Sequence, residues 1–350
     1  MTRMNGVTRT TLMLLLLLLS GGTVFSQVTT RVLDWNVHGS KFCPPHKAKC
    51  AFQGMKSHDE LNQLVKVMKD SGAGTVTLQE IFKPQADYIA NRLLGRQDGC
   101  YQDKGIGQVE HVKAHVQRPV HCYFVATKEY GAHPDYGDAI ISFRPISETT
   151  ARRIHTQHNP NINCRTKGDV VDELCDGTFA KLTGVTINAN DRLLRVYTVH
   201  LTANPSDPAE RDRQLNWQLS DVLEVIRRDN ARAQGRYRAV LTGDFNFEPP
   251  ADVNNPPPGP YRRLAEKFED AWVKGNPCPP NSGRTCGGTE PAPTTQHPTN
   301  NAHRRIDYVF LYKGSGFNLK DIRVLRTESC KAPNGPCLSD HLPISATITF

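Results

Sequence analysis

Residues that could carry out acid–base or metal chemistry follow apolar, strand-like runs at several places in the sequence. In "AVLTGDFNFEPP" (239–250) the apolar run ends at a turn with Asp244 and Asn246, and "LLRVYTVHL" (193–201) carries His200 near its end. Carboxylates bind cations or position water, and an imidazole exchanges protons near neutral pH. The other residues of this kind are Asn36, Glu80, Asp307, Asp340 and His341. Because strand ends meet at one edge of a layered fold, we expect the whole set to cluster.

Each of these residues also has an ordinary structural explanation. The alternatives are a capped turn at Asp244 or Asn246, a helix start at "LSDH" (338–341), a structural histidine at His200, and an ion pair of Asp307 with Arg304 or Arg305. These explanations treat one residue at a time. They do not account for the whole set in order, so we favour a functional interpretation.

Short strands and a few helices alternate around the candidate residues. The segment 57–74 predicts a helix, because Ser57 and Glu60 form a capping-box pattern, apolar residues recur on one helical face, and Gly72 can end it. Segment 207–228 predicts a second amphipathic helix. The expected strands are 31–39, 75–82, 138–143, 179–187, 193–201, 238–246, 305–312 and 342–350. These elements favour two packed sheets with flanking helices.

The first 26 residues have the pattern of a secretory signal peptide. Arg3 and Arg9 form a basic leading region, residues 12–19 an apolar core, and residues 24–26 a cleavage-site pattern before Gln27. The apolar run is too short to span a membrane, and no cysteine follows it closely enough for a lipid anchor. We therefore expect a secreted or extracellular protein, periplasmic in a Gram-negative bacterium, without stable membrane insertion.

All ten cysteines lie after residue 26, and an even number in an exported chain favours disulfides over a thiolate metal site. Free buried thiols are the alternative, and the sequence does not fix the connectivity. Sequential pairing is the simplest expectation: Cys43–Cys50, Cys100–Cys122, Cys164–Cys175, Cys278–Cys286 and Cys330–Cys337.

Residues 27–350 contain no segment that resembles an interdomain linker, so we expect one layered domain with disulfide-stapled insertions. The Pro- and Gly-rich stretches 249–260 and 275–298 are expected to be long surface loops. The formal net charge is +8, and it is +6 without Arg3 and Arg9. This balance suits a polyanionic partner but does not identify one.

Six motifs resemble, in the same order, those of the endonuclease/exonuclease/phosphatase superfamily, which includes deoxyribonuclease I. They are "DWNVHG", "TLQEIF", "YTVHLTANPSDP", "TGDFNFEP", "RRIDYVF" and "LSDHLPI", and the resemblance spans about residues 31–350. It implies an α/β fold, a four-layer α/β/β/α sandwich of two mixed sheets. "GDFNFEP" and "PTTQHP" also resemble the B subunit of cytolethal distending toxin, and "LQEIF" and "VHL" resemble secreted sphingomyelinases.

The resemblance implies metal-assisted hydrolysis of a phosphoester, in which charge grows on the attacking and leaving oxygens. Glu80 would bind the divalent ion, with Asn36 and Asp340 completing its oxygen shell. Mg²⁺ suits such a ligand set, and Ca²⁺ or Mn²⁺ could substitute. Asn36 and Arg144 would also contact the substrate.

The resemblance also implies an acid–base pair on either side of the phosphate. His200 and His341 would take and give the protons. Asp307 would orient His341, and Glu80 or a neighbour would support His200. In the "TGDFNFEP" motif, Asp244 would position the water or a metal, and Asn246 would donate to a phosphate oxygen.

Two departures argue against repair of abasic DNA. Position 38 is His, where apurinic-site endonucleases have Asp, and no matching tyrosine–asparagine pair precedes the helix. Export also disfavours that function. The cysteine-bounded segments 43–50 and 278–286 have no counterpart that we can place in the family pattern.

The leading functional prediction is an exported, metal-dependent endonuclease that cuts DNA with little sequence preference, with RNA as an alternative substrate. Arg-rich stretches such as "ARRIH" (151–155) and "AHRR" (302–305) could contact backbone phosphates. The alternatives are a sphingomyelinase or phosphoinositide phosphatase, and a catalytically inactive binding or toxin subunit. We expect a monomer, and the sequence leaves a partner subunit open.

Overall fold

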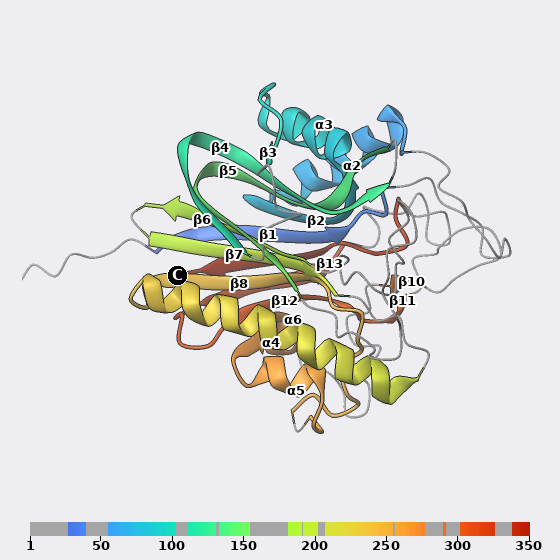
Figure 1. The fold of residues 1–350 in the computed structure, drawn as a ribbon, viewed down its shortest axis with the longest axis vertical. Coiled ribbons are helices and arrows are strands. Elements are labelled where there is room, and N and C mark those ends of the chain that lie inside the picture. The colour runs from blue at the N-terminus through green and yellow to red at the C-terminus, as the bar shows by residue number, and fades with distance from the viewer. Residues whose placement is uncertain are drawn as a thin grey trace, which may run out of the picture.

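The computed structural model describes residues 27–39, 55–102, 111–130, 133–154, 181–190, 192–201, 207–254, 256–276, 290–291, 302–325 and 338–350. Helices and strands alternate along this chain, and the strands form a large, strongly curled mixed sheet (Figure 1). The fold class expected from the sequence is confirmed. No helix in these segments is long and apolar enough to cross a membrane.

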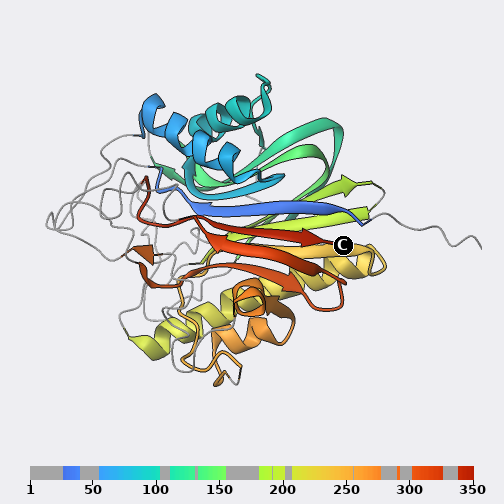
Figure 2. The same ribbon diagram turned by 180° about the vertical axis from the view of Figure 1, so that it is seen from behind.

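One hydrogen-bonded path runs through ten of the strands. Its order is β13 (Asn318–Val324), β14 (Ile344–Thr349), β1 (Thr29–Asn36), β2 (Thr75–Phe82), β5 (His133–Arg153), β6 (Lys181–Ala189), β7 (Arg192–His200), β8 (Tyr237–Asp244), β12 (Asp307–Tyr312) and β9 (Phe268–Asp270). Off this path, β4 (His111–Tyr130) pairs with β5 and with β3 (Tyr101–Gln102). β10 (Glu290–Pro291) and β11 (Ala302–Arg304) form a separate pair. Figure 2 shows β13, β14 and β1 side by side from behind.

Strand β5 joins the two halves of the sheet. Its residues 136–142 pair with β2, whereas residues 146–153 pair with β6. The two sheets expected from the sequence are therefore continuous through this one strand. Apolar residues from both halves, such as Val32 and Ile140 on one and Val196 and Val240 on the other, pack together in a shared core.

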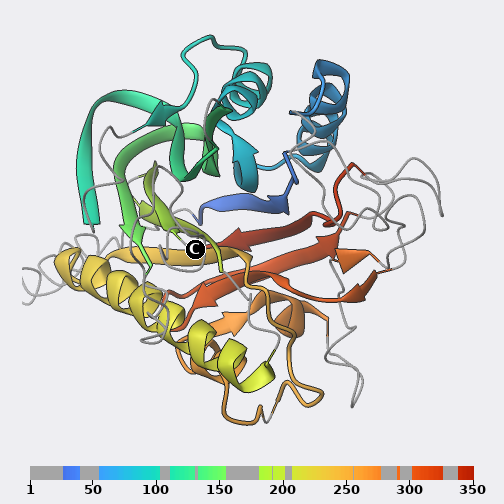
Figure 3. The same cartoon turned by 45° about the vertical axis from the view of Figure 1, so that its right-hand side comes forward.

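Helices cover both outer faces of the two half-sheets. α2 (His58–Ser71) and α3 (Lys83–Leu94) pack on the half that contains β1 and β2. α4 (Pro208–Arg232) and α5 (Pro260–Ala265) pack on the half that contains β7, β8 and β12, and α6 (Ala271–Gly275) follows β9. Figures 1 and 3 show these helices on opposite sides of the sheet layers. The order of layers is helix, sheet, sheet, helix.

Helix α2 begins and ends where its sequence predicts. The Ser57 hydroxyl accepts from the Glu60 backbone, the Glu60 carboxylate accepts from the Ser57 backbone, and Gly72 ends the helix at φ +67°. Its expected apolar face is buried, as is that of α4. These two faces anchor the outer layers against the sheets.

A disulfide joins Cys100 and Cys122, as expected from their spacing. Both residues are buried, and the bond ties β4 to the segment after α3. The other four expected pairs, the N-terminal segment 1–26 and most of the stretch 275–298 lie outside the described residues. Residues 249–254 and 256–259 form no helix or strand, in agreement with the loop expected there.

Candidate active site

The candidate residues come from strand ends at one edge of the curled sheet. β1 and β2 are parallel, with Asn36 opposite Gln79, and β7 and β8 are parallel, with His200 opposite Asp244. β12 runs antiparallel to β8 and begins with Asp307 opposite Asp244. The carboxyl ends of four strands and the start of a fifth therefore meet here. We call this edge the catalytic rim.

Asn36 holds two carboxylates together at the centre of the rim. Its side-chain nitrogen donates to Glu80 Oε1 at 3.0 Å and to Asp244 Oδ2 at 3.1 Å. Asn36 and Asp244 are buried, and Glu80 is partly exposed. The amide thus stabilises two negative charges that would otherwise repel each other.

Two histidines approach the same carboxylate, His200 from the end of β7 and His341 from the segment before β14. Nε2 of His200 and Nε2 of His341 each lie 3.6 Å from Asp244 Oδ2. His200 Nε2 also lies 3.7 Å from Glu80 Oε1. The rim therefore places two groups that can exchange protons around one acidic centre.

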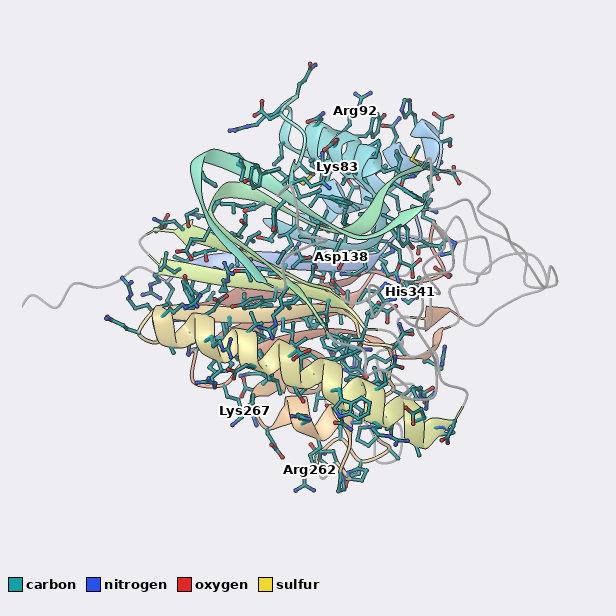
Figure 4. All side chains as sticks on the ribbon, in the orientation of Figure 1. Lys83, Arg92, Asp138, Arg262, Lys267 and His341 are labelled. Atoms are coloured by element: carbon teal, nitrogen blue, oxygen red, sulfur yellow. A yellow bond between two sulfur atoms is a disulfide. The ribbon has the colours of Figure 1, made fainter. Side chains whose placement is uncertain are left out.

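His341 is fixed on its other side by Asp307. Its Nδ1 atom lies 2.9 Å from Asp307 Oδ2 and 3.1 Å from Oδ1. The Ser339 hydroxyl accepts from the His341 backbone, and the Trp35 indole donates to the His341 carbonyl at 3.0 Å. His341 lies at this end of the sheet in Figure 4. The orienting role predicted for Asp307 has the geometry that it needs.

Three rim residues other than glycine adopt positive φ: His38 at 43°, Glu80 at 56° and Asn246 at 53°. Such backbone is costly for these residues and concentrates at functional sites. At Glu80 it coincides with a register shift between β2 and β5, between Leu78 and Ile81. This bulge re-aims the Glu80 side chain.

A glycine next to Asp244 brings two strands into close contact. Gly243 has φ +133°, and a Cβ atom there would lie 1.9 Å from the Val199 carbonyl oxygen on β7. A side chain would push β8 away from β7. The distance between Asp244 and His200 therefore depends on this glycine.

Burial and mutual charge shift the pKa values of the two carboxylates in opposite directions. Burial raises the pKa of Asp244 to about 6, although the two nearby imidazoles lower it. Burial also acts to raise the pKa of Glu80, but hydrogen bonding and charge from His38 and His200 outweigh it and hold the pKa well below its ordinary value. Near neutral pH, Glu80 is a permanent anion.

The two imidazoles are both more basic than free histidine. Burial alone lowers the pKa of His200, but the carboxylates of Asp244, Glu80 and Asp138 raise it further than burial lowers it. Burial also lowers the pKa of His341, whereas Asp307 and Asp244 raise it to a value well above the ordinary one. His341 is thus a proton donor at neutral pH, and His200 has the lesser shift.

Sequence reasoning missed three residues of the rim. The Tyr136 hydroxyl donates to Glu80 Oε2 at 2.6 Å. Asp138 is buried, and its carboxylate raises the pKa of His200. Both Asp138 and Glu80 therefore support His200. His38 Nδ1 lies 3.4 Å from Glu80 Oε2 and 3.5 Å from Asp340 Oδ2. Tyr136 lies just before, and Asp138 begins, the run 138–143 expected to be a strand, which was the available signal.

The strand expected over 238–246 ends at Asp244, and Asn246 turns back toward the neighbouring strand ends. Its backbone nitrogen donates to Asp244 Oδ1 at 2.9 Å, and its side chain donates to the Leu201 carbonyl at 2.7 Å. The segment is a capped turn, which was the structural alternative for this motif. In this geometry Asn246 holds the β7 and β8 ends together, rather than donating to a phosphate.

Arg144 lies at the other end of the sheet and not at the rim. The residue before it, Phe143, donates its backbone N–H to Gly74, and Arg144 itself donates to Asn190 Oδ1 at 3.0 Å. Gly74 precedes β2, whereas Glu80 is close to its end, so roughly 20 Å of strand separates them. The expected contact of Arg144 with the substrate at this site is wrong.

The arginines before Asp307 have other partners. Arg305 is fully buried and pairs with Asp270 at 2.7 Å, and Arg304 lies 3.8 Å from Glu248. Neither is the ion-pair partner of Asp307 that the structural alternative required. Arg305 is also inaccessible to a nucleic-acid backbone, so of the two arginines in the "AHRR" stretch Arg304 is the one open to such a contact.

A family model described as the Endonuclease/Exonuclease/phosphatase family matches residues 35–341. The chain belongs to this family. Enzymes of the Endonuclease/Exonuclease/phosphatase family are metal-dependent phosphoester hydrolases. The resemblance of the six motifs is thereby confirmed, while the likeness to the toxin subunit stays a prediction. A sequence comparison with curated proteins gave no significant match.

Solved structures of the Endonuclease/Exonuclease/phosphatase family share the fold at low sequence identity. A family protein from Bacteroides thetaiotaomicron is 14% identical, with a TM-score of 0.56 over 93% of this chain and 99% of that one. One from Beutenbergia cavernae is 19% identical, with a TM-score of 0.55 over 92% of this chain and 71% of that one. TDP2 from Caenorhabditis elegans is 14% identical, with a TM-score of 0.53 over 92% and 74%.

The rim has a donor set that fits a divalent ion of this family. Ligand atoms of Glu80, His200 and Asp244 lie within 4.8 Å of one another, as do those of Asp244, Asp307 and His341. Glu80 is ionised, and Asn36 holds it beside Asp244. Asp340 is more exposed, and its carboxylate and that of Glu80 both lie near the Nδ1 atom of His38. Glu80 and Asp244, with Asn36 between them, offer the oxygen-rich environment that a hard cation prefers.

Proposed function

We propose that this protein is an exported, divalent-metal-dependent phosphodiesterase that cuts the DNA backbone with little sequence preference. One observation carries the proposal. Nε2 of His200 and Nε2 of His341 each lie 3.6 Å from Asp244 Oδ2, and Glu80 Oε1 lies 3.7 Å from the same His200 atom. This arrangement supplies two proton-transfer groups and a metal site around a position that one phosphate can occupy.

In this proposal, separate residues position the attacking water, accept its proton and donate a proton to the leaving oxygen. Asp244 accepts from the Asn246 backbone through Oδ1 and from the Asn36 amide through Oδ2. Oδ2, which faces both imidazoles, positions the attacking water in this proposal. His200, with the smaller rise in pKa, takes a proton from that water. His341, held protonated by Asp307, gives a proton to the leaving oxygen. A Mg²⁺ ion bound by Glu80 would supply positive charge against the growing charge on the phosphate.

Export and DNA as the substrate rest on separate support. The pattern of residues 1–26 and the Cys100–Cys122 disulfide both favour an oxidising compartment. The net positive charge of the chain favours a polyanionic substrate. Phe143 is the one exposed large hydrophobic side chain among the described residues, and it lies away from the rim. The described part of the rim thus offers no apolar surface for a membrane, which disfavours a lipid substrate.

A panel of phosphoesters tests the substrate class. With Mg²⁺ present, we expect nicking of supercoiled plasmid, slower or comparable cleavage of RNA, and no release of phosphocholine or inorganic phosphate from sphingomyelin or phosphoinositide vesicles. Release from vesicles without plasmid nicking would instead support the lipid-specific alternative. Absence of turnover on every substrate would support an inactive binding subunit.

A further inference from the structure

A pocket lies at the end of the sheet opposite the catalytic rim. Its volume is about 350 Å³, and its walls come from the starts of β1 and β2, the end of α2, and strands β5, β6, β7 and β14. Gly72, at the end of α2, and Gly74 form part of one wall, where they add no side chain. This pocket contains Arg144, the arginine that the sequence analysis assigned to the active site.

Two arginines line this pocket with neutral partners only. Arg31 donates to the Thr347 hydroxyl at 2.9 Å and to the Ser71 carbonyl, and Arg144 donates to the Asn190 amide oxygen at 3.0 Å. Within the described part of the chain, neither guanidinium forms an ion pair, and no carboxylate lines the pocket. Two positive charges are therefore left to attract an anion.

The pocket also has hydroxyl donors and an aromatic wall. Thr30, Thr75 and Thr347 line it beside the arginines, and the Thr347 hydroxyl contacts Arg31 directly. Phe143 lines it too and is 47% exposed, although large apolar side chains are otherwise covered in the described residues. An exposed aromatic ring next to arginines is the combination that stacks a nucleobase while the cations hold its phosphate.

We propose that this pocket binds the phosphate and base of a nucleotide, either free or at the end of a nucleic-acid strand. Arg31 and Arg144 hold the phosphate, and Phe143 packs against the base. The volume is in the range of small-ligand sites. A single exposed ring gives too little apolar surface for insertion into a lipid bilayer, which favours a nucleotide over a lipid headgroup. The site is separate from the rim and does not depend on the proposed hydrolysis.

Calorimetric titration of the protein with thymidine monophosphate, in EDTA so that no hydrolysis occurs, tests the proposal. We expect Arg144→Gln to weaken binding at least about tenfold, because it removes a charged donor. We expect Phe143→Ala to weaken it about tenfold through lost stacking. Inorganic phosphate should bind more weakly than the nucleotide and should be insensitive to Phe143→Ala. Phe143 is exposed, so its replacement leaves the fold intact.

Two controls separate this pocket from other causes of binding. Arg232→Gln removes a positive charge at the end of α4, outside the pocket, and should leave the affinity unchanged. His341→Ala changes the catalytic rim and should also leave it unchanged. Equal losses in Arg232→Gln and Arg144→Gln, or loss of binding in His341→Ala, would overturn the proposal. Binding to phosphatidylglycerol vesicles without binding to the nucleotide would overturn it as well. None of these outcomes depends on whether the enzyme hydrolyses DNA.

Discussion

The Nδ1 atom of His341 lies 2.9 Å from Oδ2 of Asp307, and both residues are buried. This pair is held in place from several sides. The strand pairing of β8 and β12 sets Asp307 opposite Asp244, and Ser339 and Trp35 hold the His341 backbone. The contact turns the Nε2 atom of His341 toward Asp244 and the substrate position.

Replacing Asp307 by Asn tests this relationship. The amide keeps the shape of the carboxylate but removes the charge that raises the pKa of His341. We expect the rate of plasmid nicking to fall about ten-thousandfold, by analogy with loss of the orienting carboxylate in other histidine-based sites. We also expect the pKa of His341, followed by NMR, to fall. Asp321→Asn on β13, an exposed position, is the matched control and should change neither quantity. An unchanged His341 pKa in Asp307→Asn would contradict the assigned role.

The bridging role of the Asn36 amide between Glu80 and Asp244 can be tested by a substitution that adds a negative charge. Asn36→Asp replaces two donated hydrogen bonds by a third negative group at the same point. In EDTA at pH 8, we expect the free energy of unfolding to fall by about 2–4 kcal/mol. Excess Mg²⁺ should recover part of this loss, since a cation would relieve the repulsion. Asn62→Asp on α2 keeps its contact with Tyr88 and serves as the control. Equal effects of the two substitutions on urea denaturation would argue against the bridging role.

Metal binding should stabilise the folded protein through Glu80. At a Mg²⁺ concentration near 100 times the dissociation constant, linkage adds about 2.7 kcal/mol, which raises the melting temperature by roughly 5 °C or more. Glu80→Gln should remove most of this rise. Glu224→Gln, on the exposed face of α4, should retain it. A full Mg²⁺-dependent rise in Glu80→Gln would show that the ion binds elsewhere.

Asp34 makes the stability of the protein depend on pH. It lies fully buried two residues before Asn36, accepts from Thr77 and Gln79 through Oδ1, and burial raises its pKa to about 8. In the unfolded chain its pKa is about 3.9. Between these values the folded state holds one more proton than the unfolded state. The free energy of unfolding therefore falls as pH rises through this window, by up to about 1.4 kcal/mol per pH unit.

Asp34→Asn should remove this dependence, because the amide can accept the same two hydrogen bonds without ionising. Urea denaturation in EDTA at pH 5 and pH 8 measures the difference. We expect the variant to gain stability relative to the wild type as pH rises, by at most about 4 kcal/mol over this range. Identical pH dependence in the two proteins would contradict the assignment of the proton to Asp34.

Local patterns in the sequence predicted much of the framework. The capping box of α2, the amphipathic faces of α2 and α4, and the strands that carry Asn36, His200 and Asp244 lie where periodicity and turn residues indicated. Local patterns cannot show that β5 bends and pairs with both β2 and β6, since that depends on tertiary packing. The single continuous sheet was therefore not predictable from alternation of apolar residues.

The functional residues show the same division. The order of the motifs placed Glu80, His200, Asp244, Asp307 and His341 together, because each lies at or beside a strand end at one edge of the sheet. The positive φ of Glu80 and Asn246 was not visible in their residue types, and it decides where their side chains point. The prediction for Arg144 was wrong because a short arginine-containing motif does not show at which end of the sheet the arginine lies.

The rate of plasmid nicking by wild-type protein and by His200→Ala, each with Mg²⁺ and with EDTA, tests the central claim most directly. We predict that the wild type nicks supercoiled DNA only with Mg²⁺, and that His200→Ala lowers the Mg²⁺-dependent rate at least about a hundredfold, as expected for loss of a general base. The variant should keep the wild-type melting temperature to within a few degrees. Nicking by the wild type in EDTA, or a full rate in His200→Ala, would contradict the account.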